Sequence, residues 1–241
     1  MIDRAEVPGT GAKTVAIVQS SYIPWKGYFD LISRCDEFIL YDDVQYTKRD
    51  WRNRNRIKTR HGLQWLSIPV NVSGRRFQAI KDVTVAEQGW SARHWKTIAA
   101  SYAQAPCFRE YRERVEDLFR GATDTSLSVV NRRLIGGLCR IIGINTPITW
   151  SMDYRLVEGR TERLVELCRQ AGATRYLSGP SARAYIDPQL FENAGVELQY
   201  MEYAGYREYR QLFPPFEHQV SVIDAIFNLG SAAREHVVRC R

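Results

Sequence analysis

The sequence predicts an α/β fold: a mainly parallel, Rossmann-like sheet with a helical insertion. Two short apolar runs, at 15–18 and 38–41, flank a segment at 27–33 whose apolar residues recur at helical spacing. This strand, helix, strand order favours a parallel pair. Polar residues directly follow both strands, so we expect them at the carboxyl edge of the sheet, where open α/β folds bind ligands. That edge is the predicted active site.

The length and composition are typical of a globular chain with room for one large domain. Of the 241 residues, 44% are hydrophobic and 25% are charged. We expect a disordered leader over 1–13, which has no signal-peptide core, and a single α/β domain over 14–241. No apolar run approaches the roughly 20 residues that span a bilayer. The five cysteines form no CxxC and predict neither disulfides nor a zinc site, which fits a cytoplasmic location.

The chain after the opening unit begins with a basic segment at 47–60, whose WRNRNR core fits neither a strand nor an amphipathic helix. We expect a loop there, over the carboxyl edge. A strand follows at 66–70, and Pro69 places it at a sheet edge or a strand end. After a turn at 71–77, another short strand is expected at 80–85. These two strands predict a small β unit.

Helical spacing dominates the stretch near 90–145, which is the expected insertion. A first helix begins near Ala92 with Ser91 as its cap, and two more lie at 108–120 and 126–142. Beyond the insertion the α/β character returns. The elements predicted there are strands at 146–150, 174–177 and 196–203, and helices at 161–171, 188–194 and 221–229.

The net charge of +7 comes from 34 Lys and Arg against 27 Asp and Glu. Seven basic residues lie between Lys48 and Arg60, opposed only by Asp50. This pattern suits an anionic partner, namely a nucleotide phosphate, a phosphopantetheine arm, an acidic carrier protein or nucleic acid. A solvated basic face explains the same cluster.

Three residues are candidates for catalysis. Asp42 and Asp43 follow the second strand, and neighbours in a strand point to opposite faces, so we expect one of them to face the site. That carboxylate would orient an amine or accept its proton, or else pair with the basic segment. His94 is the best candidate base among the four histidines, although a lone histidine is more often structural.

The candidate binding residues fall into four groups, one of which is the pair Gln45 and Tyr46 after the second strand. The arginines of the WRNRNR core suit bidentate binding of phosphate or carboxylate, and its tryptophan suits stacking on a ring. The loop after the first strand offers hydroxyl, amide and ammonium groups, and the turn after a later strand offers donors for an oxyanion. The candidates are Gln19, Tyr22, Trp25, Lys26, Gly27, Gln45, Tyr46, Trp51, Arg54, Asn55, Arg56, Ser178 and Gly179.

Several of these motifs together resemble the WbqC-like family. They are QSSYIPWKGYF at 19–29, YDDVQY at 41–46, WRNRNR at 51–56, the strand at 66–70, HWK at 94–96, YLSG at 176–179 with Tyr185, and SVIDAIFNLG at 221–230. The likeness runs through almost the whole chain after residue 14, in the family's order. One departure is Ser20, because the family commonly has proline after the glutamine.

The resemblance implies a transferase of O-antigen, other polysaccharide or secondary-metabolite pathways. Such a protein would join an activated acyl or aminoacyl group, such as glycyl, to an amine, for example that of an amino-sugar nucleotide. The donor would be a thioester of CoA or of an acidic acyl-carrier protein, and no bound cofactor or metal is expected. The identity of donor and acceptor, the pathway, the use of ATP, the oligomeric state and the choice of base stay open.

Two other classes of function are compatible with the sequence. One is an ATP-dependent ligase or another nucleotide-binding enzyme on a nucleotidylyltransferase-like fold. The segment at 24–27 has no histidine where that fold carries HxGH, which counts against adenylation by that signature. The other class is a non-catalytic binder of a carrier protein or RNA. The aromatic residues of this sequence are dispersed and no RNA-binding motif is present, which argues against nucleic acid as the partner.

Overall fold

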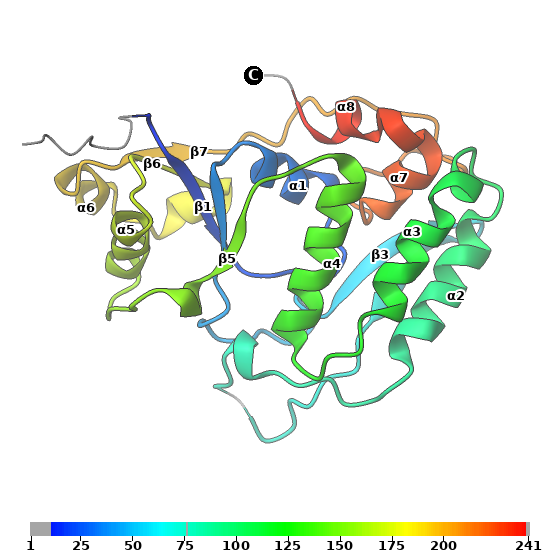
Figure 1. The fold of residues 1–241 in the computed structure, drawn as a ribbon, viewed down its shortest axis with the longest axis horizontal. Coiled ribbons are helices and arrows are strands. Elements are labelled where there is room, and N and C mark those ends of the chain that lie inside the picture. The colour runs from blue at the N-terminus through cyan, green and yellow to red at the C-terminus, as the bar shows by residue number, and fades with distance from the viewer. Residues whose placement is uncertain (1–10, 76, 240–241) are drawn as a thin grey trace, which may run out of the picture.

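The computed structural model describes residues 11–75 and 77–239 and confirms the α/β fold with a mainly parallel sheet (Figure 1). Five parallel strands lie in the order β5-β2-β1-β6-β7, with β1 at the centre. Residues 1–10 of the expected leader lie outside the described residues. The strands are β1 (Thr14–Val18), β2 (Glu37–Leu40), β5 (Ile148–Trp150), β6 (Arg175–Ser178) and β7 (Glu197–Tyr200).

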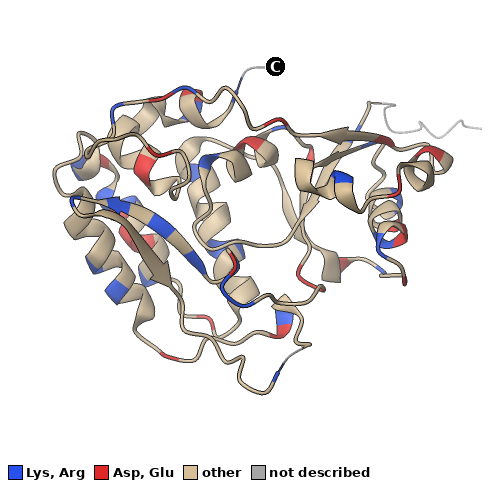
Figure 2. Cartoon of the chain, turned by 180° about the vertical axis from the view of Figure 1, so that it is seen from behind, with Lys and Arg blue, Asp and Glu red and all other residues tan. Residues whose placement is uncertain are grey.

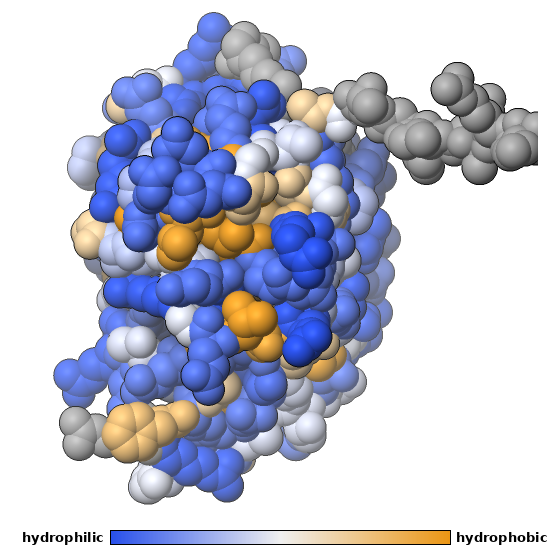
Figure 3. Space-filling view, turned by 90° about the vertical axis from the view of Figure 1, so that its left-hand side faces the viewer, coloured by the Kyte–Doolittle hydropathy of each residue, from blue (hydrophilic) through white to orange (hydrophobic). Residues whose placement is uncertain are grey.

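The central strand buries side chains on both of its faces. Ala16 belongs to a large apolar cluster with α1 and the insertion, whereas Val15 and Ile17 belong to a second cluster with α5 and α6. Continuous apolar runs are typical of parallel strands that are covered on both faces. The side of the molecule that carries α5 and α6 is largely hydrophilic, with small apolar areas between the polar groups (Figure 3). These helices are α1 (Lys26–Ser33), α5 (Thr161–Gln170) and α6 (Pro188–Asn193).

The insertion contains three helices close to their predicted positions. The first begins at Trp90, because Gly89, with φ of 79°, turns the chain into the helix. Ser91 therefore lies in the first turn, and its expected role as the cap is wrong. Ser126 does cap the third helix, since its side chain accepts a bond from a backbone N–H. The helices are α2 (Trp90–Tyr102), α3 (Phe108–Arg120) and α4 (Leu127–Ile142).

The second half of the basic segment forms a hairpin, so the loop predicted over 47–60 is wrong there. Strand β3 (Arg54–Thr59) pairs antiparallel with β4 (Gly62–Ser67). Asn55 and Ile57 of β3 are buried, and arginines alternate with them on the outer face. A half-buried strand is usually recognised in a sequence by apolar residues at every second position. In β3 a polar asparagine takes one of these inward positions, so the alternation of apolar and polar residues is not visible.

The remaining predicted strands differ from the structure in one region. The strand expected at 66–70 overlaps only the end of β4, and the one expected at 80–85 is a 3-10 turn, η1 (Ile80–Asp82). A single antiparallel bridge joins Val70 to Val85. Pro69, which has no N–H, limits further pairing here.

Gly137 allows α4 to lie close to α3. A Cβ atom at Gly137 would lie 2.2 Å from Cδ2 of Leu118. At the neighbouring Gly136, the nearest atom to such a Cβ would be Nη1 of Arg140, at 3.7 Å. One glycine is therefore needed for helix packing and the other is not. Two short helices follow β7: α7 (Ile223–Leu229), which packs on the insertion, and α8 (Ala233–Val237), which packs on α1 and α7.

We expect Gly137→Ala to be less stable than Gly136→Ala by about 1–3 kcal/mol, because only the former forces a side chain into an occupied space. The gain in helix propensity is the same in both variants and cancels in the comparison. Urea unfolding of the two proteins measures the difference. Equal stabilities would show that the contact with Leu118 relaxes without cost.

Candidate functional site

A cavity of about 800 Å³ opens at the carboxyl ends of β1, β2 and β6. The chain leaves β1 toward β2 on one side, and β6 lies on the other side, so the cavity is at the topological switch point where open α/β sheets bind ligands. We call it the edge cavity. Its polar and aromatic lining is Gln19, Trp25, Tyr28, Tyr41, Gln45, Arg160, Arg163, Tyr176, Ser178, Ser181, Tyr185 and Tyr203.

Five of the candidates from the sequence line this cavity. They come from the end of β6 and from the loops that follow β1, β2 and β6, as expected for a carboxyl edge. The hydroxyl of Ser178 lies 3.2 Å from that of Tyr176, and the carbonyl of Gln19 accepts a bond from Tyr28. The five residues are Gln19, Trp25, Gln45, Ser178 and Gly179.

Two arginines of the cavity were missed by the sequence analysis. Arg160 lies with its guanidinium 3.6 Å from the ring centre of Tyr185, and Arg163 donates to the carbonyl of Val157 at 2.9 Å. Among the described residues that line the cavity there is no Asp, Glu, His, Lys or Cys. The two positive charges are thus not neutralised within the cavity. The two arginines follow Gly159 and lie at the start of a predicted helix that comes after a strand. This position in the sequence could have indicated a ligand-binding role.

The other walls of the cavity are aromatic. Trp25 meets Tyr203 edge to face, with ring centres 5.2 Å apart. Burial raises the pKa of Tyr41, and the nearby Arg163 guanidinium partly opposes this rise. Tyr185 is 43% exposed at the cavity. Aromatic walls beside unneutralised guanidinium groups suit a ligand that carries both a ring and an anion.

Neither predicted catalytic carboxylate lines the edge cavity. Asp42 is fully buried and accepts bonds from the backbone N–H of Ser20, at 2.9 Å, and from the hydroxyl of Ser128. Burial raises its pKa, and these two bonds oppose the rise. Asp43 forms an ion pair with Lys81 and accepts a bond from Ser151. In this geometry both acids position loops, and a direct catalytic role stays a prediction.

The candidates of the WRNRNR core lie on the hairpin and do not line the edge cavity. Figure 2 shows the row of Lys and Arg residues along it. Arg54 lies with its guanidinium 4.2 Å from the ring centre of Trp65, and Trp51 is 5.4 Å from the same ring. Arg56 lies over both indoles, at 5.8 Å and 5.5 Å, and donates to Gln219. This outer face therefore combines exposed indoles with cations.

Two neighbouring candidates are occupied by structural contacts. Asn55 is buried, and its Nδ2 donates to the carbonyls of Tyr22 and Ile23 at 3.2 Å and 3.0 Å. Tyr46 donates its hydroxyl proton to Asn53 at 2.8 Å. The predicted ligand-binding role of Asn55 conflicts with this geometry, because both amide hydrogens already have buried partners.

Lys26 and Gly27 are also candidates that do not line the edge cavity. Nζ of Lys26 lies 5.1–5.5 Å from the ring centres of Tyr206, Tyr209 and Phe216. Desolvation lowers the pKa of Lys26 to about 8, against the opposing effect of nearby acids. A Cβ at Gly27 would lie 2.3 Å from the indole of Trp25, so this glycine lets the indole lie on α1.

The predicted base, His94, lies in the interior between α2 and the loop after β1. Its Nδ1 is 2.7 Å from the hydroxyl of Tyr22, which is fully buried, and Trp90 packs edge to face on its ring. Neither His94 nor Tyr22 lines the edge cavity. Desolvation lowers the pKa of His94 from 6.5 to about 4. A buried imidazole of this kind is neutral at pH 7 and serves as a structural partner of Tyr22.

No group of three His, Cys, Asp or Glu residues within 11–75 and 77–239 is arranged to hold a metal ion. In the same part of the chain, no helix has both the length and the apolar character needed to cross a bilayer. The thiols of Cys35, Cys139 and Cys168 are buried, and burial raises the pKa of Cys139 and Cys168 to about 12 and that of Cys35 far above its usual range. They are poor nucleophiles at neutral pH.

We expect His94 to make the protein less stable as the pH falls from 6.5 toward 4. The unfolded chain takes up a proton on this residue in that interval and the folded protein does not, so about 3 kcal/mol of stability is lost. Urea unfolding of the wild type and of His94→Gln at pH 7 and pH 4 measures the loss. The variant should show a smaller dependence on pH, and an identical dependence would contradict the assignment.

Comparison with known proteins agrees with the sequence motifs. The WbqC-like protein family matches residues 19–236. The uncharacterized protein Rv1507c of Mycobacterium tuberculosis (strain ATCC 25618 / H37Rv) is 48% identical over 229 residues, which are 95% of this chain and 99% of that protein. No solved structure matches the chain significantly. The predicted resemblance is confirmed, and the chain belongs to the WbqC-like protein family.

Proposed function

We propose that the protein is an enzyme that binds an anionic, ring-bearing amine, such as an amino-sugar nucleotide, in the edge cavity and transfers an acyl or aminoacyl group to it from a thioester. The observation that carries this proposal is the pair Arg160 and Arg163, which line a cavity with aromatic walls and with no acid among its described lining residues. Guanidinium groups bind phosphates bidentately, and the aromatic rings stack on a base or sugar.

The reaction needs no nucleophile from the protein. The amine nitrogen attacks the thioester carbonyl, the carbon–nitrogen bond forms, and the carbon–sulfur bond breaks. The departing thiolate takes up the proton that the amine releases. The exposed hydroxyl of Ser181 is the available donor for the carbonyl oxygen as it gains negative charge, whereas that of Ser178 would have to turn away from the hydroxyl of Tyr176 to serve. This route agrees with a cavity lined by no acid, histidine or cysteine among the described residues.

We further propose that an acidic carrier protein delivers the donor to the outer face of the hairpin. Trp51 and Trp65 are 39% and 43% exposed there, and Arg54 and Arg56 lie over their rings. Exposed indoles rimmed by arginines are typical of a protein-binding surface. The activity would then belong to cytoplasmic surface-glycan or secondary metabolism.

The second candidate function is an ATP-dependent ligase or another nucleotide-binding enzyme. The same two arginines support it, since they bind the phosphates of ATP as well as those of a sugar nucleotide. A requirement for ATP separates the two reactions.

We expect Arg163→Gln to raise the KM for the anionic substrate at least tenfold with a smaller effect on kcat, because a charge-assisted hydrogen bond to bound substrate is lost. Arg169→Gln is the matched control on the same helix, since Arg169 is exposed and paired with Glu166. Steady-state kinetics of both variants measure the change. An unaltered KM in Arg163→Gln would show that this arginine does not bind the substrate.

Incubation with acyl-CoA or a glycyl-carrier thioester and an amino-sugar nucleotide should give a product heavier by one acyl group without ATP. Mass spectrometry of the mixture measures it. If the product forms only when ATP is present, and AMP or ADP is released, the proposed transferase is wrong and the ligase is the better assignment.

A further inference from the structure

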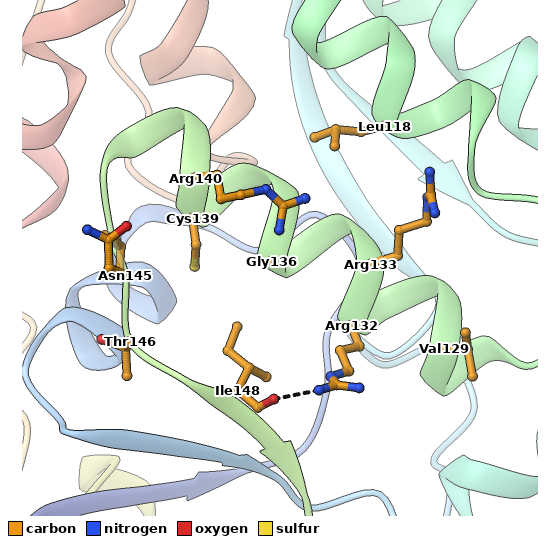
Figure 4. Close-up of a pocket in the computed structure, with 11 residues that line it drawn as sticks. Leu118, Val129, Arg132, Arg133, Gly136, Cys139, Arg140, Asn145, Thr146 and Ile148 are labelled. Carbon is orange, nitrogen blue, oxygen red and sulfur yellow. Dashed lines mark hydrogen bonds between the residues drawn. The ribbon is translucent and has the colours of Figure 1, made fainter.

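A second cavity, of about 610 Å³, lies across the exposed face of α4, between α3 and the amino end of β5 (Figure 4). We call it the α4 groove. Its walls include Val129 and Ile148, and Thr146 precedes β5 at one end. The edge cavity opens at the opposite, carboxyl ends of the strands, so the two sites are separate. The volume is in the range of sites for small molecules.

Three arginines line the α4 groove, and α4 contains no acidic residue. Arg132 donates to the carbonyl of Ile148 at 2.8 Å and lies over the ring of Trp150, which leaves most of its N–H groups available. Arg133 and Arg140 are exposed. None of the three has an ion pair among the described residues.

Some arginines of two other helices, the neighbouring α3 and the more distant α5, have acidic partners on the same helix. Arg120 of α3 pairs with Asp117 and Glu116, and Arg169 of α5 pairs with Glu166. Ion pairs at helical spacing stabilise an exposed helix face, whereas unopposed like charges do not. The arginines of α4 have no such acidic partner on their own helix, so their charge is available to an anion that enters the groove.

Gly136 supplies an independent observation at the centre of the α4 groove. It occupies a helix interior, where glycine is the least favourable residue other than proline. No packing contact requires it, since the nearest atom to an added Cβ is the end of Arg140 at 3.7 Å. Gly137, by contrast, packs on Leu118. The missing side chain at Gly136 leaves the helix backbone bare between the arginines, and Figure 4 shows Arg140 reaching along the helix toward it.

We propose that the α4 groove binds a small molecule with a diphosphate group, such as a nucleoside diphosphate, whose phosphates lie over Gly136. Arg133 and Arg140 are seven positions apart, about 10 Å along the helix axis. A chain of two phosphates fits between two cations at this spacing better than a single phosphate does. The apolar residues beside β5 then contact the body of the ligand.

Isothermal titration calorimetry with inorganic pyrophosphate and with ADP tests the site. The parent protein carries Arg163→Gln, so that binding in the edge cavity is weakened. We expect this parent to bind both probes, and the added Arg140→Gln to weaken binding about tenfold or more. Added Arg169→Gln, on an arginine with its own acid, should leave the affinity unchanged.

Gly136→Ala separates ligand binding from folding. We expect it to weaken binding about tenfold while it raises the melting temperature by roughly 2–4 °C, because alanine favours the helix and its methyl group enters the groove. Loss of stability and binding together would not fit the proposal. No binding to the parent up to about 1 mM, equal affinity in Arg140→Gln, or unchanged affinity in Gly136→Ala would each overturn it.

Discussion

The buried carboxylate of Asp42 holds together parts of the molecule that are distant in sequence. Its oxygens accept bonds from the backbone N–H of Ser20, in the loop after β1, and from the hydroxyl of Ser128 on α4. Asn131, one turn further along α4, donates to Oγ of Ser20 and to the carbonyl of Arg52 before the hairpin. All these groups are buried, so each depends on the others for a partner. The shape of the carboxyl edge is set by this layer of polar bonds beneath the edge cavity.

The loop between β1 and α1 depends on the same kind of support. Ile23 has a φ of 34°, which is unfavourable for a β-branched residue by about 1–3 kcal/mol. Its carbonyl accepts a bond from Asn55, and the carbonyl of Pro24 accepts one from the backbone N–H of Val222. A strained turn persists only where its surroundings fix it. The hairpin and the start of α7 therefore give the loop, and Trp25 within it, one conformation.

The main sheet was predictable because its central strands are buried on both faces. Such strands are continuous apolar runs, which are visible in the sequence without knowledge of the residues that they contact. Strand β3 was not predictable, because its inward asparagine matters only for the carbonyls that it meets in the folded chain. The same limit applies to the edge cavity. Gln19, Gln45 and Ser178 could be located from the ends of predicted strands, whereas Arg163 comes from a helix. Which face of that helix borders the cavity is decided by tertiary packing.

The structure shows where some of the basic residues behind the net charge of +7 lie. Some of the cations without an ion pair among the described residues lie at the edge cavity, in the α4 groove and on the hairpin, each beside apolar or aromatic residues. Helix α4 faces the viewer in Figure 1, and the hairpin faces the viewer in the reverse view of Figure 2. A single strand of nucleic acid requires a continuous cationic track with stacking surfaces. Separate cationic surfaces on different sides of the molecule favour separate, discrete anions over one extended strand of RNA, which agrees with the small phosphorylated ligands proposed for the edge cavity and the α4 groove.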